Sequence, residues 1–266
     1  MTTNESSTES SSDDAILVRR TPGVAVISIN NPAQRNALTP DSADLLVRHL
    51  ASIDDDPTVG VLIIRGEGGT FCSGANLSTL GSAMDDPASE ESYSAMDRIY
   101  RSFTRLGEMK VPTIAAVRGF AVGAGVNLAL AADVRVVSNT ARIISGFAKI
   151  GLHPGGGHFQ LLVQASSREA ATAMGIFSQE ISGARAAQFG LAWESVDDDA
   201  VDDRAVVLAE AAAKDPDLAR KSIQSLRLTT PQVVPWVTAL QAERAPQLWS
   251  LRRSADRNEK GPGNEK

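Results

Sequence analysis

Apolar residues along this chain follow two kinds of spacing, and the first kind marks strands. Two short continuous runs, VGVLIIRG (59–66) and TIAAVRG (113–119), are typical of strands buried on both faces of a parallel sheet. Earlier in the chain, AILVRR (15–20) and VAVISIN (24–30) flank a Thr-Pro-Gly turn and predict an antiparallel pair. The segments DVRVVS and ARIIS predict further strands.

The second kind of spacing places apolar residues on one face of a helix. It predicts helices near 40–52, near 93–109 and from about 123 to 132, while an acidic, Ser/Asp-rich segment around 78–92 breaks the period. From about residue 157 onward the period is mostly helical. Because strands that alternate with helices indicate right-handed βαβ units, we expect an α/β fold.

Length and local composition suggest one large core with loose ends. A chain of 266 residues can bury a hydrophobic core without disulfides or metal ions to stabilise it, and no repeat or linker divides its middle. Residues 1–14 are polar and acidic, so we expect a disordered leader, followed by a core over 15–200. We expect a helical region over 201–257, serving as a lid or an assembly surface, and a loose tail over 258–266.

Charge and cysteine content exclude several classes of protein. The net charge is −6, from 26 basic and 32 acidic residues, and no long Lys/Arg cluster favours a nucleic-acid partner. No run of 18 apolar residues occurs, so a membrane-spanning helix is not expected. One cysteine, and three histidines without metal-binding spacing, predict no disulfide, no metal site and no cofactor. Together these features favour a cytoplasmic protein.

Two partial motifs do not complete the chemistry that they suggest. Gly123-Ala124-Gly125 begins like a dinucleotide-binding fingerprint, but Leu128 stands where the third glycine is needed. Ser73-Gly74 resembles the end of the Gly-x-Ser-x-Gly elbow of hydrolases, but Phe71 replaces its first glycine. The sequence therefore favours neither dinucleotide binding nor a serine hydrolase.

Small residues fill two loops that each follow a predicted buried strand, FCSGAN (71–76) and GFAVGAG (119–125). Gly123 to Gly125 lies where a helix should begin, so its N–H groups point outward. Two such loops side by side could aim two backbone donors at one carbonyl oxygen, which is the geometry of an oxyanion hole. The glycines could equally serve only tight turns and close helix packing.

Four segments in this order resemble the enoyl-CoA hydratase/isomerase (crotonase) superfamily over about residues 15–225. They are NPAQRNALTP, GTFCSGANL, VPTIAAVRGFAVGAGVNLALAADVRV and FAKIGLHPGGG. The resemblance implies a crotonase-like ββα spiral core with a helical C-terminal part, assembled as a homotrimer or a dimer of trimers. It also implies that the ligand is an acyl-CoA thioester.

The resemblance further assigns residues to that ligand. The family's two oxyanion donors correspond to the backbone N–H groups of Ala75 and Ala124. The Arg-Asn-Ala-Leu segment matches the family's contacts with pantetheine and adenine, and Asn76 stands where the family often has an aspartate. The substrate-binding positions implied in this way are Gln34, Arg35, Ala37, Asn76, Leu77, Gly123 and Gly155.

At the acid–base pair the sequence departs from the family. A hydratase of this family uses two glutamates to orient water and to transfer its proton, and the matching positions here are Asn127 and Phe147. Gly155 stands where some dienoyl-CoA isomerases carry an aspartate. Because neutral side chains cannot accept that proton at pH 7, we expect ordinary hydration of crotonyl-CoA to be slow or undetectable.

Other residues are candidates for the missing base. His153 and His158 flank a Pro-Gly-Gly-Gly loop and titrate near neutrality, so either could be a general base, or each could instead satisfy backbone groups near a helix start. Asn127 and Ser145 could bond a water or a hydroxyl on the acyl chain. Cys72 has no basic neighbour in sequence and is expected to be a small buried residue. Acidic residues in the segment before the helix are further candidates, or simply a solvated face: Asp85, Asp86, Glu90 and Glu91.

Two functions remain open on the sequence. The first is an enzyme that stabilises the enolate of an acyl-CoA thioester, with non-standard or weak hydratase or isomerase chemistry. The second is a carrier that binds acyl-CoA without turning it over. They differ in whether any group near the acyl α- and β-carbons can move a proton.

Overall fold

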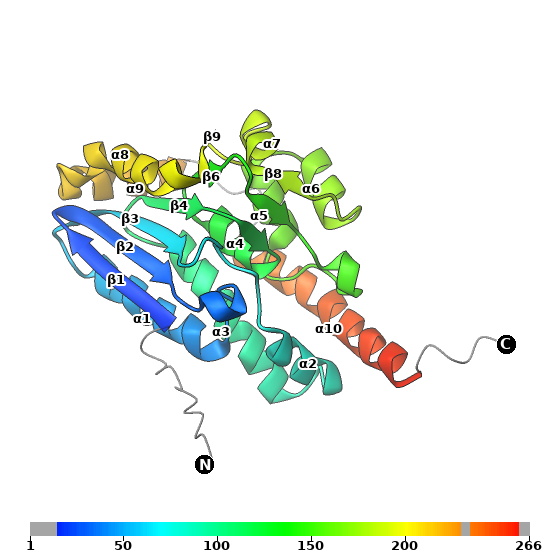
Figure 1. Cartoon of the computed structure of the whole chain (residues 1–266). Helices are drawn as coiled ribbons and strands as arrows, with labels where there is room; N and C mark the ends of the chain where they lie inside the picture. The colour runs from blue at the N-terminus through cyan, green and yellow to red at the C-terminus, as the bar shows by residue number, and fades with distance from the viewer. Residues whose placement is uncertain (1–14, 230–234, 261–266) are drawn as a thin grey trace, which may run out of the picture.

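Two β-sheets form the centre of the fold, which is a mixed α/β arrangement (Figure 1). The structure, a computed structural model, describes residues 15–229 and 235–260; the expected leader over 1–14 and the last part of the expected tail, 261–266, lie outside them. The larger sheet has six strands in the order β1-β2-β3-β4-β6-β9, and the smaller has the order β5-β7-β8. The strands are β1 (Ile16–Thr21), β2 (Gly23–Ile29), β3 (Val59–Gly66), β4 (Thr113–Val117), β5 (Phe120–Val122), β6 (Val134–Ser138), β7 (Arg142–Ile144), β8 (Ile181–Ser182) and β9 (Glu194–Val196).

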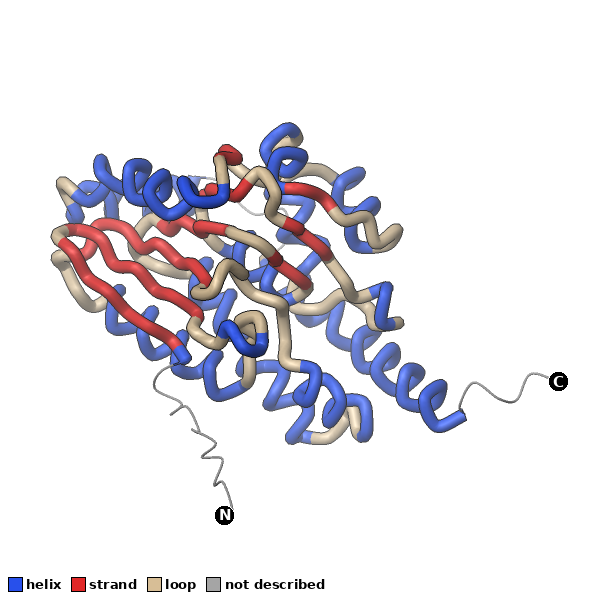
Figure 2. The backbone as a smooth tube through the Cα atoms, in the orientation of Figure 1, coloured by secondary structure: helices blue, strands red, loops and turns tan. Residues whose placement is uncertain are grey.

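Helices connect the strands and continue to the C-terminal side of the chain (Figure 2). Within the described residues, each helix is too short or too polar to cross a membrane. The α-helices are α1 (Pro40–Asp54), α2 (Leu77–Asp85), α3 (Glu90–Gly107), α4 (Ala124–Ala131), α5 (His158–Ala165), α6 (Arg168–Gly175), α7 (Gly183–Gln188), α8 (Val201–Ala213), α9 (Pro216–Thr229) and α10 (Trp236–Lys260). Short 3₁₀ turns lie at Pro32–Gln34, Ala148–Ile150 and Asp198–Ala200.

Strand pairing confirms the predicted alternation. β1 and β2 pair antiparallel, with Ile16 opposite Ile29, as expected from their short connecting turn. β2 with β3, β3 with β4, and β4 with β6 all pair in parallel. Since parallel neighbours require a crossover connection, the helices between these strands follow directly from the topology.

Both faces of the larger sheet are covered, which explains the uninterrupted apolar runs. Along β3, Val61 and Ile63 pack in a cluster that includes Ala205 of α8, whereas the alternate residues Leu62 and Ile64 belong to the main core. Helices α8 and α9 lie over one face, and α1 and α3 lie over the other (Figure 1). Because successive strand residues point to opposite faces, a strand covered twice needs apolar residues at every position.

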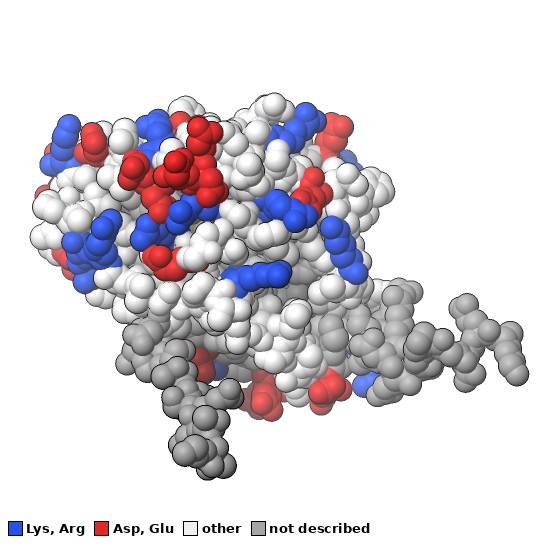
Figure 3. Space-filling model, viewed as in Figure 1, with Lys and Arg blue, Asp and Glu red and all other residues white. Residues whose placement is uncertain are grey.

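On the face that Figure 3 shows, acidic side chains gather in one group near the top, with separate basic side chains beside and below it. Several of them tie α8 to the sheet: Asp202 pairs with Arg65 at 2.6 Å and with Arg118 at 3.3 Å. Arg204 of α8 pairs with Glu194 of β9 at 2.9 Å. These contacts fix the outer helix layer against the strands without forming a continuous basic face on this side of the described chain.

The segment around 78–92 differs from its prediction. It holds helix α2 up to Asp85, and α3 already begins at Glu90. Two side-chain caps explain the helix starts, because Asn76 accepts a hydrogen bond from the N–H of Ser78 and Ser89 accepts one from the N–H of Ser92. At the other end of the chain, α10 continues to Lys260, three residues into the stretch expected to be a loose tail.

Candidate active site

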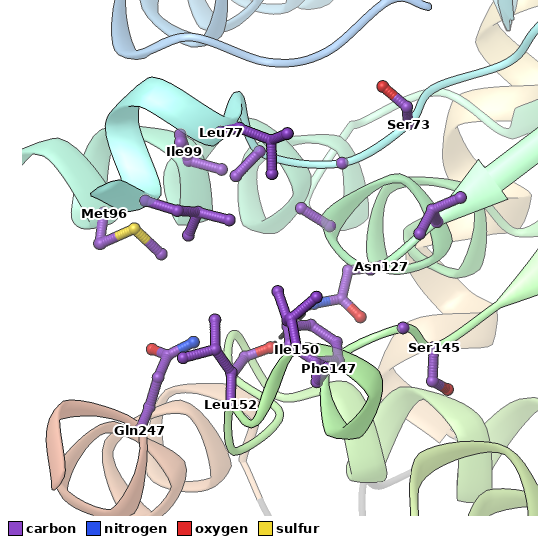
Figure 4. A pocket seen from close by; sticks show the side chains of 18 of the residues that line it. Ser73, Leu77, Met96, Ile99, Asn127, Ser145, Phe147, Ile150, Leu152 and Gln247 are labelled. Carbon is purple, nitrogen blue, oxygen red and sulfur yellow. Dashed lines mark hydrogen bonds between the residues drawn. The ribbon is translucent and has the colours of Figure 1, made fainter. Parts of the chain in front are cut away.

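A largely apolar cavity of about 190 Å³ opens among α2, α3, α4, α10 and the loop that follows β7. In Figure 4, Leu77, Met96 and Ile99 lie on one side of it, and Ile150, Leu152 and Gln247 lie on the opposite side. The lining residues are Ser73, Gly74, Ala75, Leu77, Leu80, Met96, Ile99, Tyr100, Val122, Gly123, Ala124, Asn127, Ser145, Gly146, Phe147, Ile150, Leu152, Gly155 and Gln247.

Two backbone N–H groups at one end of this cavity come from the two small-residue loops. The N–H of Leu38 donates to the carbonyl of Gly74 (2.7 Å) and the N–H of Asn76 donates to the carbonyl of Leu38 (2.8 Å), which holds Ala75 extended between them. Ala124 is the first residue of α4, so its N–H has no acceptor within the helix. Among the described residues, no hydrogen bond uses the N–H of either Ala75 or Ala124.

Glycines bring these two loops into contact. A Cβ on Gly74 would lie 2.7 Å from the carbonyl oxygen of Val122 and 3.5 Å from the nitrogen of Ala124. A Cβ on Gly125 would lie 2.1 Å from the carbonyl oxygen of Cys72, so only glycine permits α4 to begin against that loop. These contacts bring Gly74, the neighbour of Ala75, against the start of α4 at Ala124, and both alanines line the cavity.

Asn127 stands three residues into α4 beyond Ala124 and anchors a buried polar chain. Its Nδ2 donates to the carbonyl of Gly155 (3.0 Å), so its Oδ1 accepts from Nδ1–H of His158 (2.6 Å). With Nδ1 carrying the proton, Nε2 of His158 accepts from the hydroxyl of Ser145 (2.7 Å). Burial lowers the pKa of His158 to about 3, so the imidazole is neutral at physiological pH.

The order Ser145, His158, Asn127 is that of a nucleophile, a base and an orienting residue, but the geometry does not suit that role. The hydroxyl of Ser145 points away from the cavity (Figure 4), and the residue is only 1% exposed. Asn127 offers no negative charge to stabilise a protonated His158, unlike the carboxylate of a hydrolase triad. The chain of hydrogen bonds therefore acts to hold the cavity wall in place.

The two histidines expected near the reacting carbons do not line the cavity. His158 is fully buried behind Asn127 and Ser145, with its ring 5.0 Å from that of Phe147. His153 is half-buried, and its Nδ1 lies 2.6 Å from the carbonyl oxygen of Pro154. His158 connects to the cavity through the side chains of Asn127 and Ser145.

The Asn-Pro-Ala-Gln-Arg-Asn-Ala-Leu segment lies against the first oxyanion loop. Asn36 adopts a left-handed conformation (φ 56°), and its side chain donates to the carbonyls of Glu67 (2.8 Å) and Thr70 (2.6 Å). Asn76 donates to Oε1 of Gln34 (2.7 Å), and the N–H of Ser73 donates to the carbonyl of Arg35 (3.0 Å). Gln34 and Arg35 are exposed and Ala37 is buried; all three lie outside the cavity itself.

The described lining of the cavity contains almost no ionisable side chains. Tyr100 is the one described lining residue with an ionisable side chain, and burial raises the pKa of its phenol above the ordinary value. Cys72 is fully buried outside the lining, as expected, and burial raises the pKa of its thiol to about 12. No group of three potential metal ligands occurs among the described residues. The acidic candidates are exposed and lie outside the lining: Asp85, Asp86, Glu90 and Glu91.

Helix α10 supplies two residues that sequence reasoning missed. Gln247 lines the cavity and accepts a hydrogen bond from the hydroxyl of Tyr100. One turn earlier, Glu243 accepts hydrogen bonds from the N–H groups of Gly157 (2.8 Å), His158 (3.0 Å) and Phe159 (3.2 Å) at the start of α5. A helical period identifies which face of α10 is buried but not the residues that it meets, so no sequence signal pointed to either contact.

Comparison with known proteins gives a consistent result. The sequence model of the enoyl-CoA hydratase/isomerase family matches residues 19–251. "Probable enoyl-CoA hydratase EchA14" of Mycobacterium tuberculosis is 40% identical over 185 residues, covering 70% of this chain and 71% of that protein. The 1,2-epoxyphenylacetyl-CoA isomerase of Escherichia coli is 31% identical over 202 residues, covering 76% of this chain and 77% of that protein. A crystal structure of an enoyl-CoA hydratase from Mycobacterium avium subsp. paratuberculosis superposes with a TM-score of 0.78 at 27% identity, covering 91% of this chain and 98% of that one.

Proposed function

Because the chain belongs to the enoyl-CoA hydratase/isomerase family, we propose that it binds an acyl-CoA thioester in this cavity and stabilises the enolate of its acyl group. The thioester oxygen accepts hydrogen bonds from the N–H groups of Ala75 and Ala124. The observation that supports the proposal is that Ala75 and Ala124 line the same apolar cavity and that neither N–H group has an acceptor among the described residues.

The two amides act on the charge that develops during the reaction. As water or hydroxide from the solvent takes a proton from the acyl α-carbon, negative charge moves onto the thioester oxygen, and both hydrogen bonds strengthen. The N-terminus of α4 adds a positive end at the same place, because Ala124 is its first residue. Removing one such donor typically costs about 10²–10³ in rate.

Hydration by a pair of carboxylates is not available in this cavity. Asn127 occupies one of the two family positions and is held by Gly155 and His158, whereas the apolar ring of Phe147 occupies the other. General acid–base groups contribute about 10²–10⁴-fold, so hydration of crotonyl-CoA should be slow by a similar factor. Because no described lining side chain can accept the α-proton, enolate formation or isomerisation would rely on solvent as the base and proceed at a low rate.

A second candidate function is that of an acyl-CoA carrier. The scarcity of ionisable side chains in the described lining favours it, since a carrier needs the oxyanion contacts and the apolar wall but no proton acceptor. The two functions share the binding step and differ at the α-carbon. We also propose assembly as a homotrimer or a dimer of trimers, which would cover exposed apolar side chains such as Phe177, Trp193 and Leu218.

Exchange of the acyl α-proton tests the proposed enzyme directly. Butyryl-CoA incubated with the protein in deuterium oxide should gain deuterium at the α-carbon, measured by mass spectrometry. Ala124→Pro removes one oxyanion N–H at a helix position that tolerates proline and should lower the exchange rate about 10²–10³-fold. Arg168→Pro, at the first residue of α6, makes the same change away from the cavity and should leave exchange unaltered.

The same experiment separates the two functions. A shift of the melting temperature on adding butyryl-CoA, with no exchange, would establish the carrier and reject the enzyme. The absence of any shift with CoA, acetyl-CoA or a longer acyl-CoA would reject both. Hydration of crotonyl-CoA at a rate typical of the family would contradict the roles assigned to Asn127 and Phe147.

A further inference from the structure

Helix α5 begins without a capping side chain of its own. Its N-cap residue is Gly157, which adopts a left-handed conformation (φ 78°) and has no side chain to accept a hydrogen bond. The next helix, α6, is different, because the hydroxyl of Ser167 accepts a hydrogen bond from the N–H of Ala170 (3.1 Å). The first N–H groups of a helix have no partner inside the helix, so those of α5 need an acceptor from another part of the chain.

Glu243 of α10, 86 positions beyond Gly157, supplies this acceptor. One carboxylate oxygen accepts hydrogen bonds from the N–H groups of Gly157 and His158, and the other accepts one from the N–H of Phe159. The carboxylate is buried, and its negative charge lies at the positive end of the helix dipole. Glu243 therefore acts as the cap of α5, although it belongs to a different helix.

The loop that precedes α5 depends on such contacts for its shape. Gly155, Gly156 and Gly157 follow one another, and the last two have left-handed φ values of 76° and 78°. Glycines lose much conformational freedom when they are ordered, so a fixed loop needs bonds that hold it. The carbonyl of Gly155 accepts a hydrogen bond from Asn127 (3.0 Å), and that of Gly156 accepts one from the indole N–H of Trp236 (3.1 Å). Helix α10 thus holds the loop and the start of α5 through two of its side chains.

Helix α10 is itself fixed against α3. The ring of Trp236 stacks on that of Phe103, with centroids 6.0 Å apart and planes at 20°. The guanidinium of Arg244, the residue after the cap, lies 3.9 Å from the ring centroid of Tyr93 and donates a hydrogen bond to Asp97 (3.1 Å). These contacts set the position of the carboxylate relative to α3, whose residues also line the cavity.

The cap borders the cavity wall without being part of it. Gly155 and Asn127 line the cavity, whereas Glu243 lies outside the lining that the described residues form. A displacement of the glycine loop would move the carbonyl of Gly155 away from Asn127 and change the shape of that wall. Loss of the cap would therefore affect a ligand through the loop, without removing any group that contacts the ligand.

We infer that Glu243 is a positioning residue for the acyl-CoA site, because its cap on α5 fixes the loop 155–157 and couples the docking of α10 to the shape of the cavity. This inference rests on the proposed function, since the ligand is the thioester proposed to bind in that cavity. Such coupling is reciprocal, so a ligand that requires the ordered loop also stabilises the docking of α10.

Binding of butyryl-CoA to two variants, measured by isothermal titration calorimetry at pH 8, tests this inference. Burial raises the pKa of Glu243 to about 7, so the carboxylate is mostly ionised at this pH. Glu243→Ala removes both acceptor oxygens of the cap, and the ligand must then order the loop, so the dissociation constant should rise about fivefold or more. Glu243→Gln retains one oxygen acceptor and should restore part of the lost affinity.

A matched control separates positioning from stability. Ser167→Ala removes the cap of α6, the helix that follows α5. It should lower the free energy of unfolding in urea titrations but keep the dissociation constant within about twofold of the wild-type value. If Glu243→Ala does not fold, Glu243→Gln replaces it, with an expected rise in the dissociation constant of about threefold.

Hydrogen exchange measures the same coupling from the other direction. Butyryl-CoA should slow the exchange of backbone amides along α10 in the wild-type protein, because the bound ligand stabilises the docked helix. The slowing should be smaller in Glu243→Gln, whose weaker cap transmits less of the effect.

The outcomes separate this inference from the function on which it rests. Four results would overturn the inference and leave the proposed function standing: an unchanged affinity in the Glu243 variants, a Glu243→Gln variant that binds no better than Glu243→Ala, an equal loss of affinity in Ser167→Ala, or no slowing of exchange along α10. Failure of every acyl-CoA to bind the wild-type protein would instead overturn the proposed function itself.

Discussion

Replacing Glu243 by glutamine should remove a specific dependence of stability on pH. Burial raises the pKa of this carboxyl from an ordinary value of 4.5 to about 7. The hydrogen bonds that it accepts from three backbone N–H groups lower the pKa, but by less than burial raises it. The folded protein therefore holds the proton more tightly than the unfolded chain does, so the free energy of unfolding falls as the pH rises from 4.5 through about 7. This rise in pKa corresponds to about 3 kcal/mol.

The assay is urea unfolding of the wild-type protein and of the Glu243→Gln variant at pH values between 5 and 8. The glutamine side chain of the variant cannot titrate, so the difference in unfolding free energy, wild type minus variant, should decrease by about 2–3 kcal/mol over this range. Contributions from all other groups cancel in this difference. Glu210→Gln, on the exposed side of α8, controls for the loss of one negative charge. A difference for Glu243→Gln that stays constant with pH, or that increases, would refute the reasoning.

Two further predictions concern a buried ion pair and the assembly. Asp54→Asn leaves Arg105 without its carboxylate partner and weakens the hydrogen bond from the N–H of Lys110 (2.8 Å). The substitution should therefore lower the free energy of unfolding, measured by urea titration, by about 3 kcal/mol. A loss below about 1 kcal/mol would contradict this prediction. Light scattering after size exclusion should give three or six times the chain mass of 28.0 kDa, and a monomer would reject the proposed assembly.

Strand positions and the oxyanion loops could be predicted from the sequence because their signals are local. A strand covered on both faces favours a continuous apolar run, and residues 59–64 of VGVLIIRG form one, ahead of the partly buried Arg65. Likewise, Gly125 must be small because α4 starts against the carbonyl of Cys72, and this need is visible as a cluster of small residues. The contact between the two loops is made by an isolated bridge between Cys72 and Ala121.

The rest of the site depends on contacts between distant parts of the chain. His158 was a candidate base because its sequence neighbours place it in the right loop, but its burial and its low pKa come from packing against Asn127, Ser145 and Phe147. Gln247 reaches Tyr100 across 147 positions of sequence, and no local pattern specifies such a pair. Helix α2 was missed because its start depends on one side-chain cap at Asn76.

The spread of the cavity lining along the chain has a consequence for the order of events during synthesis. Lining residues run from Ser73 to Gln247, and the latter belongs to the last helix. A polypeptide emerging from the ribosome can pair β1 to β4 early, because proteins are made from the N-terminus. The cavity wall is complete only once Gln247 has been synthesised, so a bound thioester contacts the full lining late in synthesis.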